Sequence, residues 1–266
     1  MGLFDWFKKS SDKQAGQGKE RARQKITDRN VVDAIRQIDG SATSIANARK
    51  AVASSSMSNS ERAEAFRQIA AAVPYRNQRD NGADGDVMCN MTSMAMSLNG
   101  LGLGADESKQ QFENTLDGRR KKAGLSRYDE NQRETLAEKQ GVDATTLRTP
   151  NFANAAAAKD WYMKNVRPRL ESGQTATFGV EGGGFRHVIR VEWVEENGLK
   201  IDDPFGRGVN EDDEGKVGYG ALNAKTGQKG VGADDFMSWA QVAKLNNNKY
   251  IQVYGERPAK ARRAAS

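Results

Sequence analysis

Patterns typical of helices occupy the first two thirds of this chain. Apolar residues at positions 31, 34, 35 and 38 share one helix face, and Gly40 ends that helix. A second helix is expected from Ser60 to Val73, where Pro74 stops it. The intervening residues, 41–58, are only weakly helical. Further helices are expected over residues 106–119, 128–140 and 153–170, the last broken or bent at Pro168.

Patterns typical of strands follow. Runs rich in β-branched and aromatic residues predict strands over residues 176–180, 185–194, 199–202 and 250–254. Asn197-Gly198 lies in a tight turn between the second and third of them. Residues 205–232 are rich in glycine and charged residues, which predicts a long surface loop, and residues 236–245 predict a short helix.

Length and composition favour one domain with appendages over two small domains. The chain has 266 residues, of which 29% are charged, and its mean hydropathy is −0.78. We therefore expect a soluble protein without a membrane span. The N-terminus lacks a charged start followed by an apolar core, so we expect synthesis in the cytoplasm without a Sec signal.

The single cysteine and the single histidine restrict the chemistry that is possible. They allow no intramolecular disulfide and no cluster of zinc ligands, so we expect neither a metal nor a cofactor. The formal charge of +6 would suit a polyanionic partner. However, the 35 acidic residues are nearly as numerous as the 41 basic ones. This balance favours an ordinary solvated surface and no nucleic-acid partner.

The two ends of the chain are predicted to lie outside the core. Residues 1–25 read as a flexible arm that begins with a short aromatic and basic segment. Those aromatic residues either dock a secretion or virion assembly partner or fold back onto the domain. Residues 26–74 are expected to form a helical segment, and the basic residues 256–266 a disordered tail.

Cys89 stands where a predicted helix begins, and a helix N-terminus together with a nearby imidazole lowers the pKa of a thiol. His187 begins a predicted strand, and the hairpin that follows ends at Asp202 and Asp203. Singly, a cysteine is most often a small core residue. Jointly, the order cysteine, histidine, aspartate predicts a thiol hydrolase whose carboxylate orients the imidazole. Side-chain alternation favours Asp203, but Asp202 remains the alternative.

Four short motifs also carry a family resemblance. They are Gln78-Arg79-Asp80-Asn81, Cys89-Asn90-Met91-Thr92-Ser93-Met94-Ala95-Met96, His187-Val188-Ile189 and Asp203-Pro204-Phe205-Gly206. Over residues 75–254 the chain resembles the double-glycine leader peptidase-like group of papain-like cysteine peptidases. The resemblance implies an α+β fold in which a helical half carrying the nucleophile packs on an antiparallel sheet, with a hydrolase domain over residues 75–255.

By motif position, the resemblance implies that Cys89, His187 and Asp203 are catalytic and that Gln78 helps to form the oxyanion hole. Asn90-Met91 follows the cysteine where many members have Gly-Pro, a variant associated with phage and bacterial members. We therefore expect a cysteine hydrolase that cleaves amide bonds in bacterial cell-wall peptide, delivered by a phage particle or a secretion apparatus. The alternatives are a protease acting on polypeptides and a non-catalytic binding or structural module on the same scaffold.

Overall fold

A computed structural model describes residues 25–104, 111–182, 185–206, 209–211, 217–219, 232–246 and 249–257. Its helices are α2 (Arg29–Arg36), α3 (Ala42–Ser54), α4 (Asn59–Ala71), the short 3-10 helices η1 (Gln78–Asp80) and η2 (Gly82–Val87), α5 (Cys89–Gly100), α6 (Phe112–Lys122), α7 (Glu130–Lys139), α8 (Ala155–Asn165), α9 (Arg167–Glu171) and α11 (Trp239–Leu245). Its strands are β1 (Val142–Arg148), β2 (Thr175–Gly182), β3 (Phe185–Val194), β4 (Gly198–Asp202), β5 (Val209–Glu211), β6 (Val217–Tyr219), β7 (Asp235–Ser238) and β8 (Tyr250–Glu256).

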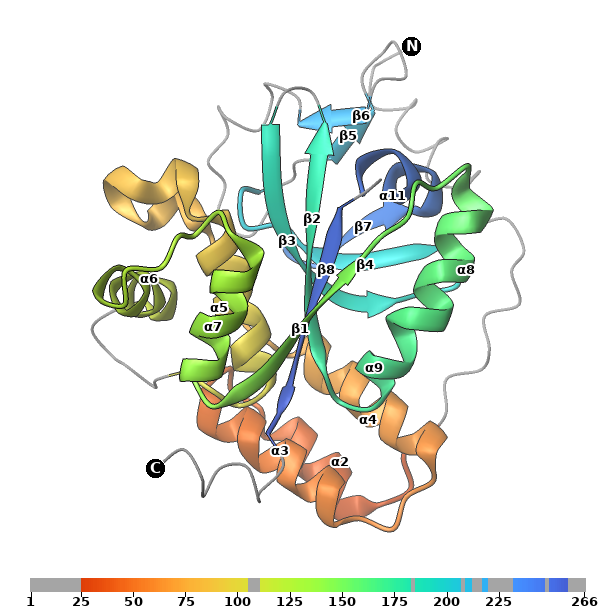
Figure 1. Ribbon diagram of the computed structural model, residues 1–266. Helices are drawn as coiled ribbons and strands as arrows, with labels where there is room; N and C mark the ends of the chain where they lie inside the picture. Colours follow the sequence, from red (N-terminus) through yellow and green to blue (C-terminus); the bar gives the residue numbers. More distant parts are fainter. Residues whose placement is uncertain are drawn as a thin grey trace, which may run out of the picture.

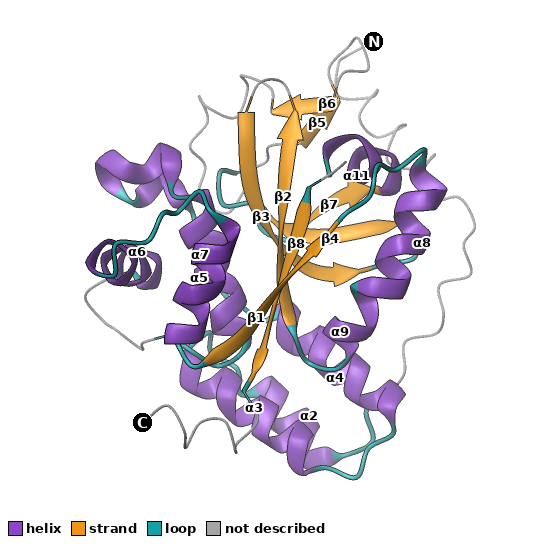
Figure 2. Cartoon of the chain, in the orientation of Figure 1, coloured by secondary structure: helices purple, strands orange, loops and turns teal. Residues whose placement is uncertain are grey.

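A six-stranded antiparallel sheet forms the centre of the fold, in the order β1-β8-β2-β3-β4-β7. Figure 1 shows α5, α6 and α7 on one side of this sheet and α8, α9 and α11 on the other. The same segregation of helices around the strands is visible in Figure 2. The fold is therefore α+β, as the sequence predicts.

Three apolar clusters hold these layers together. The largest joins the sheet to α8, α9 and α11 and includes Tyr162 and Phe178, both completely buried. A second joins α5, α6 and α7 to β1 and β8, with Met94 and Leu116 in it. The third lies among α2, α3, α4 and α5. Because α5 contributes to two of these clusters, it is buried almost throughout its length.

The helical segment before residue 75 packs directly onto the rest of the fold. The guanidinium of Arg49, on α3, donates to Glu256 Oε1 at the end of β8 at 2.9 Å. It also donates to the carbonyl oxygens of Gly100 at 3.1 Å and Gly173 at 2.9 Å. One buried cation thus joins α3 to the ends of α5, α9 and β8.

Several local predictions are corrected by the structure. Residues 41–58 were expected to be weakly helical, yet α3 is a regular helix of 13 residues, because Ser41 caps it and its apolar face is buried. The next helix begins at Asn59 with Ser58 rather than Ser60 at its cap, since Ser58 and Glu61 form a capping box. The predicted break at Pro168 is confirmed, because α8 ends at Asn165 and α9 begins at Arg167.

Two edge strands and one small sheet were missed. Strand β1 lies in a segment with no strand prediction. Strand β7 takes up the first three residues of the helix expected at residues 236–245, so α11 begins only at Trp239. Part of the predicted loop at residues 205–232 forms the antiparallel pair β5–β6. Residues 1–24 of the predicted arm and 258–266 of the predicted tail lie outside the described residues. Among the helices that are described, none is long and apolar enough to cross a membrane.

Candidate active site

Cys89 is the first residue of α5, the helix that packs against β2 and β3. Two buried serines hold this helix on the sheet. Ser93 Oγ donates to Val188 O on β3 at 2.9 Å, and Ser97 Oγ donates to Ala176 O on β2 at 3.3 Å. Since Ser93 lies one turn after Cys89, its bond fixes the thiol relative to the strand that carries His187. The N-cap residue of α5, Met88, makes no capping hydrogen bond with its side chain.

His187 and Asp203 come from the hairpin formed by β3 and β4. His187 Nε2 lies 2.8 Å from Asp203 Oδ1, and both side chains are buried. This contact leaves Nδ1 of the imidazole for the thiol of Cys89, to which His187 is hydrogen-bonded. The three residues therefore form a chain of thiol, imidazole and carboxylate.

Electrostatics favour the ionised thiol in this arrangement. Burial raises the pKa of Cys89, but the His187 imidazole and the backbone N–H groups of Val188 and Asn90 outweigh it and hold the pKa below its ordinary value of 9.0. Burial lowers the pKa of His187, but Asp203 and Cys89 outweigh it and raise the pKa to about 10. Each group thus favours the charged form of the other, a thiolate beside an imidazolium.

The two candidate carboxylates have different partners. Asp203 contacts His187, whereas Asp202 forms a buried ion pair with Arg190. Because His187 and Arg190 are three residues apart on β3, their side chains leave the strand on opposite faces. Arg190 also donates to Ala70 O at 2.8 Å, on α4. Asp203 is the carboxylate at the histidine, and Asp202 belongs to a separate buried pair.

A cluster around Asp203 holds the carboxylate in place. Asp203 Oδ1 accepts the N–H of Phe205 at 2.9 Å, and the carbonyl oxygen of Asp203 accepts the hydroxyl of Tyr75 at 2.7 Å. The Phe205 ring lies edge-on to His187 with ring centres 6.2 Å apart, and the guanidinium of Arg79 lies 5.1 Å from the centre of the Phe205 ring. Phe205 and Arg79 lie in the quoted motifs without a predicted role, whereas nothing in the sequence pointed to Tyr75.

Gln78, the predicted oxyanion residue, lies in η1 and is almost fully buried. Its backbone N–H donates to Pro204 O at 2.8 Å, which joins η1 to the segment after Asp203. Its side-chain Nε2 donates to Gly85 O at 2.7 Å. A primary amide carries two N–H bonds, so one donor of Gln78 has no partner among the described residues.

A cleft of about 450 Å³ opens beside Cys89 and His187. Its lining comes from the start of α5, from Tyr128 and the first turn of α7, and from β1, β2, β3 and the start of β8. Tyr128, whose side chain is 71% exposed, stands among the lining residues. The cleft has room for an extended peptide segment next to the thiol.

The fold and the arrangement of thiol, imidazole and carboxylate are those of a papain-like cysteine peptidase. A profile of the Peptidase_C39 like family matches residues 70–218, which is more than half of the chain and includes all four predicted site residues. The chain belongs to this family, and the predicted family resemblance is confirmed. A search of curated protein sequences found no match.

Proposed function

We propose that this peptidase hydrolyses amide bonds with Cys89 as nucleophile, His187 as general acid and base, and Asp203 as the group that orients the imidazole. The observation that carries the proposal is the continuous contact from the thiol through the imidazole to Asp203, at the uncapped start of a buried helix. Both the helix dipole and the imidazolium stabilise a thiolate at that position.

In the proposed reaction, the Cys89 thiolate attacks the carbonyl carbon of the scissile amide and forms a C–S bond. The proton on His187 passes to the leaving nitrogen as the C–N bond breaks, which gives an amine and a thioester. Water, deprotonated by His187, then attacks the thioester, releases the carboxylic acid and regenerates the thiolate. Two N–H donors, from the Cys89 backbone and the uncommitted N–H of Gln78, would stabilise the negative oxygen in both steps.

For the substrate, we propose bacterial cell-wall peptide, cleaved by an enzyme that a phage particle or a secretion apparatus delivers. The test is to incubate the protein with purified peptidoglycan and, separately, with denatured protein, and to identify the products by mass spectrometry. We expect release of peptide fragments from peptidoglycan. Their masses will identify the amide bond that is cleaved. Cleavage confined to the denatured protein would instead establish a polypeptide protease.

Asp203→Ala is expected to lower kcat/KM by a factor of about 10² to 10⁴, because His187 loses the acceptor that fixes its orientation. Asp203→Asn keeps an oxygen for the His187 Nε2 and the Phe205 N–H, so it should retain more activity. Steady-state hydrolysis of the substrate identified above measures both.

Asp202→Asn is the matched control for Asp203. It removes the negative charge that pairs with the buried Arg190 and should lower the free energy of unfolding by about 3–5 kcal/mol. The kcat/KM of the folded protein should nevertheless stay within a few-fold of wild type. A larger kcat/KM loss in Asp202→Asn than in Asp203→Ala would show that Asp202, and not Asp203, orients the imidazole of His187.

Gln78→Ala is expected to lower kcat by a factor of about 10² to 10³ with little change in KM, because a donor to the oxyanion acts mainly in the transition state. Asn81→Ala is the control, since Asn81 Nδ2 donates to Gln78 O at 3.0 Å and so supports the same segment without supplying the donor. If both variants lose the same activity, Gln78 supports the fold and takes no part in the reaction.

A further inference from the structure

The cleft beside Cys89 carries more positive than negative charge. Four cationic side chains line it, and two carboxylates accompany them: Arg133, Arg148, Arg186, Lys249, Glu130 and Glu181. Each carboxylate lies near two of the cations. Glu181 pairs with Lys249 and lies 3.6 Å from Arg186, and Glu130 lies 2.5 Å from Arg148 and interacts with Arg133 through space. Two positive charges in the described lining are therefore left unbalanced.

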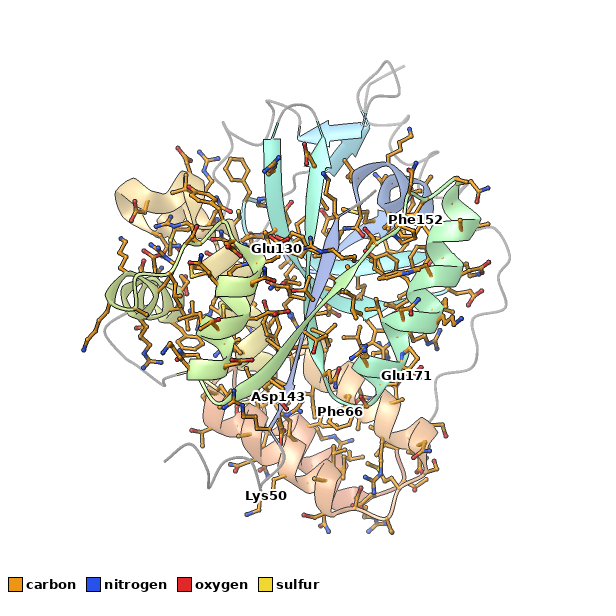
Figure 3. All side chains as sticks on the ribbon, viewed as in Figure 1. Lys50, Phe66, Glu130, Asp143, Phe152 and Glu171 are labelled. Atoms are coloured by element: carbon orange, nitrogen blue, oxygen red, sulfur yellow. The ribbon has the colours of Figure 1, made fainter. Side chains whose placement is uncertain are left out.

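Arg133 differs from the other three cations because it is fixed. Arg148 and Arg186 have side chains that are 61% and 86% exposed, whereas Arg133 is only 3% exposed. Its Nε donates to Gln252 Oε1 at 3.0 Å, and its Nη1 donates to Arg127 O at 2.8 Å. These bonds hold the guanidinium at the N-terminal end of α7, where Figure 3 labels Glu130.

The third nitrogen of this guanidinium has no acceptor in the part of the chain that the structure describes. Arg133 Nη2 is buried and makes no hydrogen bond with any described residue. The guanidinium lies 5.1 Å from the ring centre of Tyr250, which also lines the cleft. Burial raises the pKa of Tyr250 to about 12, and the charges of both Arg133 and Cys89 act on its hydroxyl. Arg133 therefore lines the same cleft as the proposed nucleophile and carries a charged donor without a partner among the described residues, which is costly unless a ligand completes it.

We propose that this cleft binds a peptide with a free carboxylate close to the scissile amide, and that Arg133 receives that carboxylate. The inference rests on the proposed function, in which the cleft holds the peptide that Cys89 attacks. An arginine binds a carboxylate through short, charge-assisted hydrogen bonds, and Nη2 supplies a donor that no described group uses. Cell-wall peptides carry such carboxylates, so the inference narrows the substrate to those in which that group is free and not amidated.

Binding to the full-length Cys89→Ala protein tests this without relying on turnover. The probes are two synthetic peptides with a C-terminal amide, L-Ala-γ-D-Glu-L-Lys-D-Ala-D-Ala with a free α-carboxylate on the γ-linked glutamate and the same peptide with that α-carboxylate as an amide. We expect calorimetry to give a Kd about tenfold to a hundredfold lower for the carboxylate form, as for one hydrogen-bonded charge pair. The preference should shrink as salt is added, because part of it is long-range attraction.

Adding Arg133→Gln to the Cys89→Ala protein should abolish the preference for the carboxylate peptide. Arg133→Lys in its place should keep part of that preference, because lysine retains the positive charge but lacks the planar guanidinium that can bind a carboxylate through two hydrogen bonds. Arg36→Gln, on α2 and with a side chain 76% exposed, is the control and should keep the full preference. Should Arg133→Gln fail to fold, Arg148→Gln provides the second test. It frees Glu130 to neutralise Arg133, and it should also weaken the preference.

Equal affinity for the two peptides, or binding of neither, overturns the inference. So does a preference that survives in a folded Arg133→Gln protein, because Arg133 would then only support the fold. Failure of the proposed function would give a different experimental result. Wild-type protein would then release no product from peptidoglycan, whatever the Cys89→Ala protein binds.

Discussion

Cys89→Ala is expected to reduce hydrolysis by a factor of about 10⁴ to 10⁶, since an enzyme that works through a covalent intermediate loses its reaction route with its nucleophile. The thiol is not needed for the fold, because α5 is held by its apolar cluster and by Ser93 and Ser97. Product release followed by mass spectrometry at equal protein concentrations measures the loss.

The control for Cys89→Ala is thermal unfolding of the same sample, which should stay close to that of wild type. Cys89→Ser adds a second control, since it keeps a hydroxyl near His187 but lacks the easily ionised thiol, and it should be almost as inactive. Turnover within tenfold of wild type in a folded Cys89→Ala protein would show that another residue performs the reaction.

His187→Ala is expected to cause a loss of the same order, because the imidazole both holds Cys89 as a thiolate and delivers the proton to the leaving nitrogen. The double variant Cys89→Ala/His187→Ala should be no less active than the worse single variant, since residues that act as one unit are not additive. Steady-state rates of the three variants measure this.

If the losses of activity in the two single variants multiply in the double variant, Cys89 and His187 do not act as one unit. A His187→Ala protein that keeps most of its activity would lead to the same conclusion. The buried contact with Asp203 means that removing the imidazole leaves a carboxylate with one partner fewer, so unfolding must be measured alongside activity.

Local patterns were sufficient to predict the site in outline. Cys89 and His187 are unique in the chain, and each lies at the start of an element with a strong pattern, so their placement depends on short-range signals. The hairpin β3–β4 is likewise a local feature, and it brings the carboxylates back beside the histidine. Alternation along the strand favoured Asp203, which is the residue that contacts His187.

Elements and contacts that depend on distant residues could not be predicted. Strand β1 is an edge strand with polar threonines, and it is ordered by pairing with β8 more than a hundred residues later. The contact between Tyr75 and Asp203 joins residues 128 positions apart. The regular helix α3 was underestimated because its stability comes from burial of Ile45 and Val52 against other helices.

The pH dependence of Cys89 alkylation tests the central claim, because the chain has a single cysteine and the label reports on that thiol alone. In wild type, the second-order rate with iodoacetamide should reach its plateau at a lower pH than for an ordinary thiol of pKa 9.0, since His187 lowers the pKa of Cys89. The pair should persist until His187 loses its proton near pH 10, above its ordinary value of 6.5.

In His187→Ala, burial would be the main remaining influence and should raise the pKa of the thiol, so the rate at pH 7 should fall by at least about tenfold. A wild-type rate that follows an ordinary thiol, and that His187→Ala leaves unchanged, would contradict an activated Cys89. It would favour a binding or structural module on a peptidase scaffold.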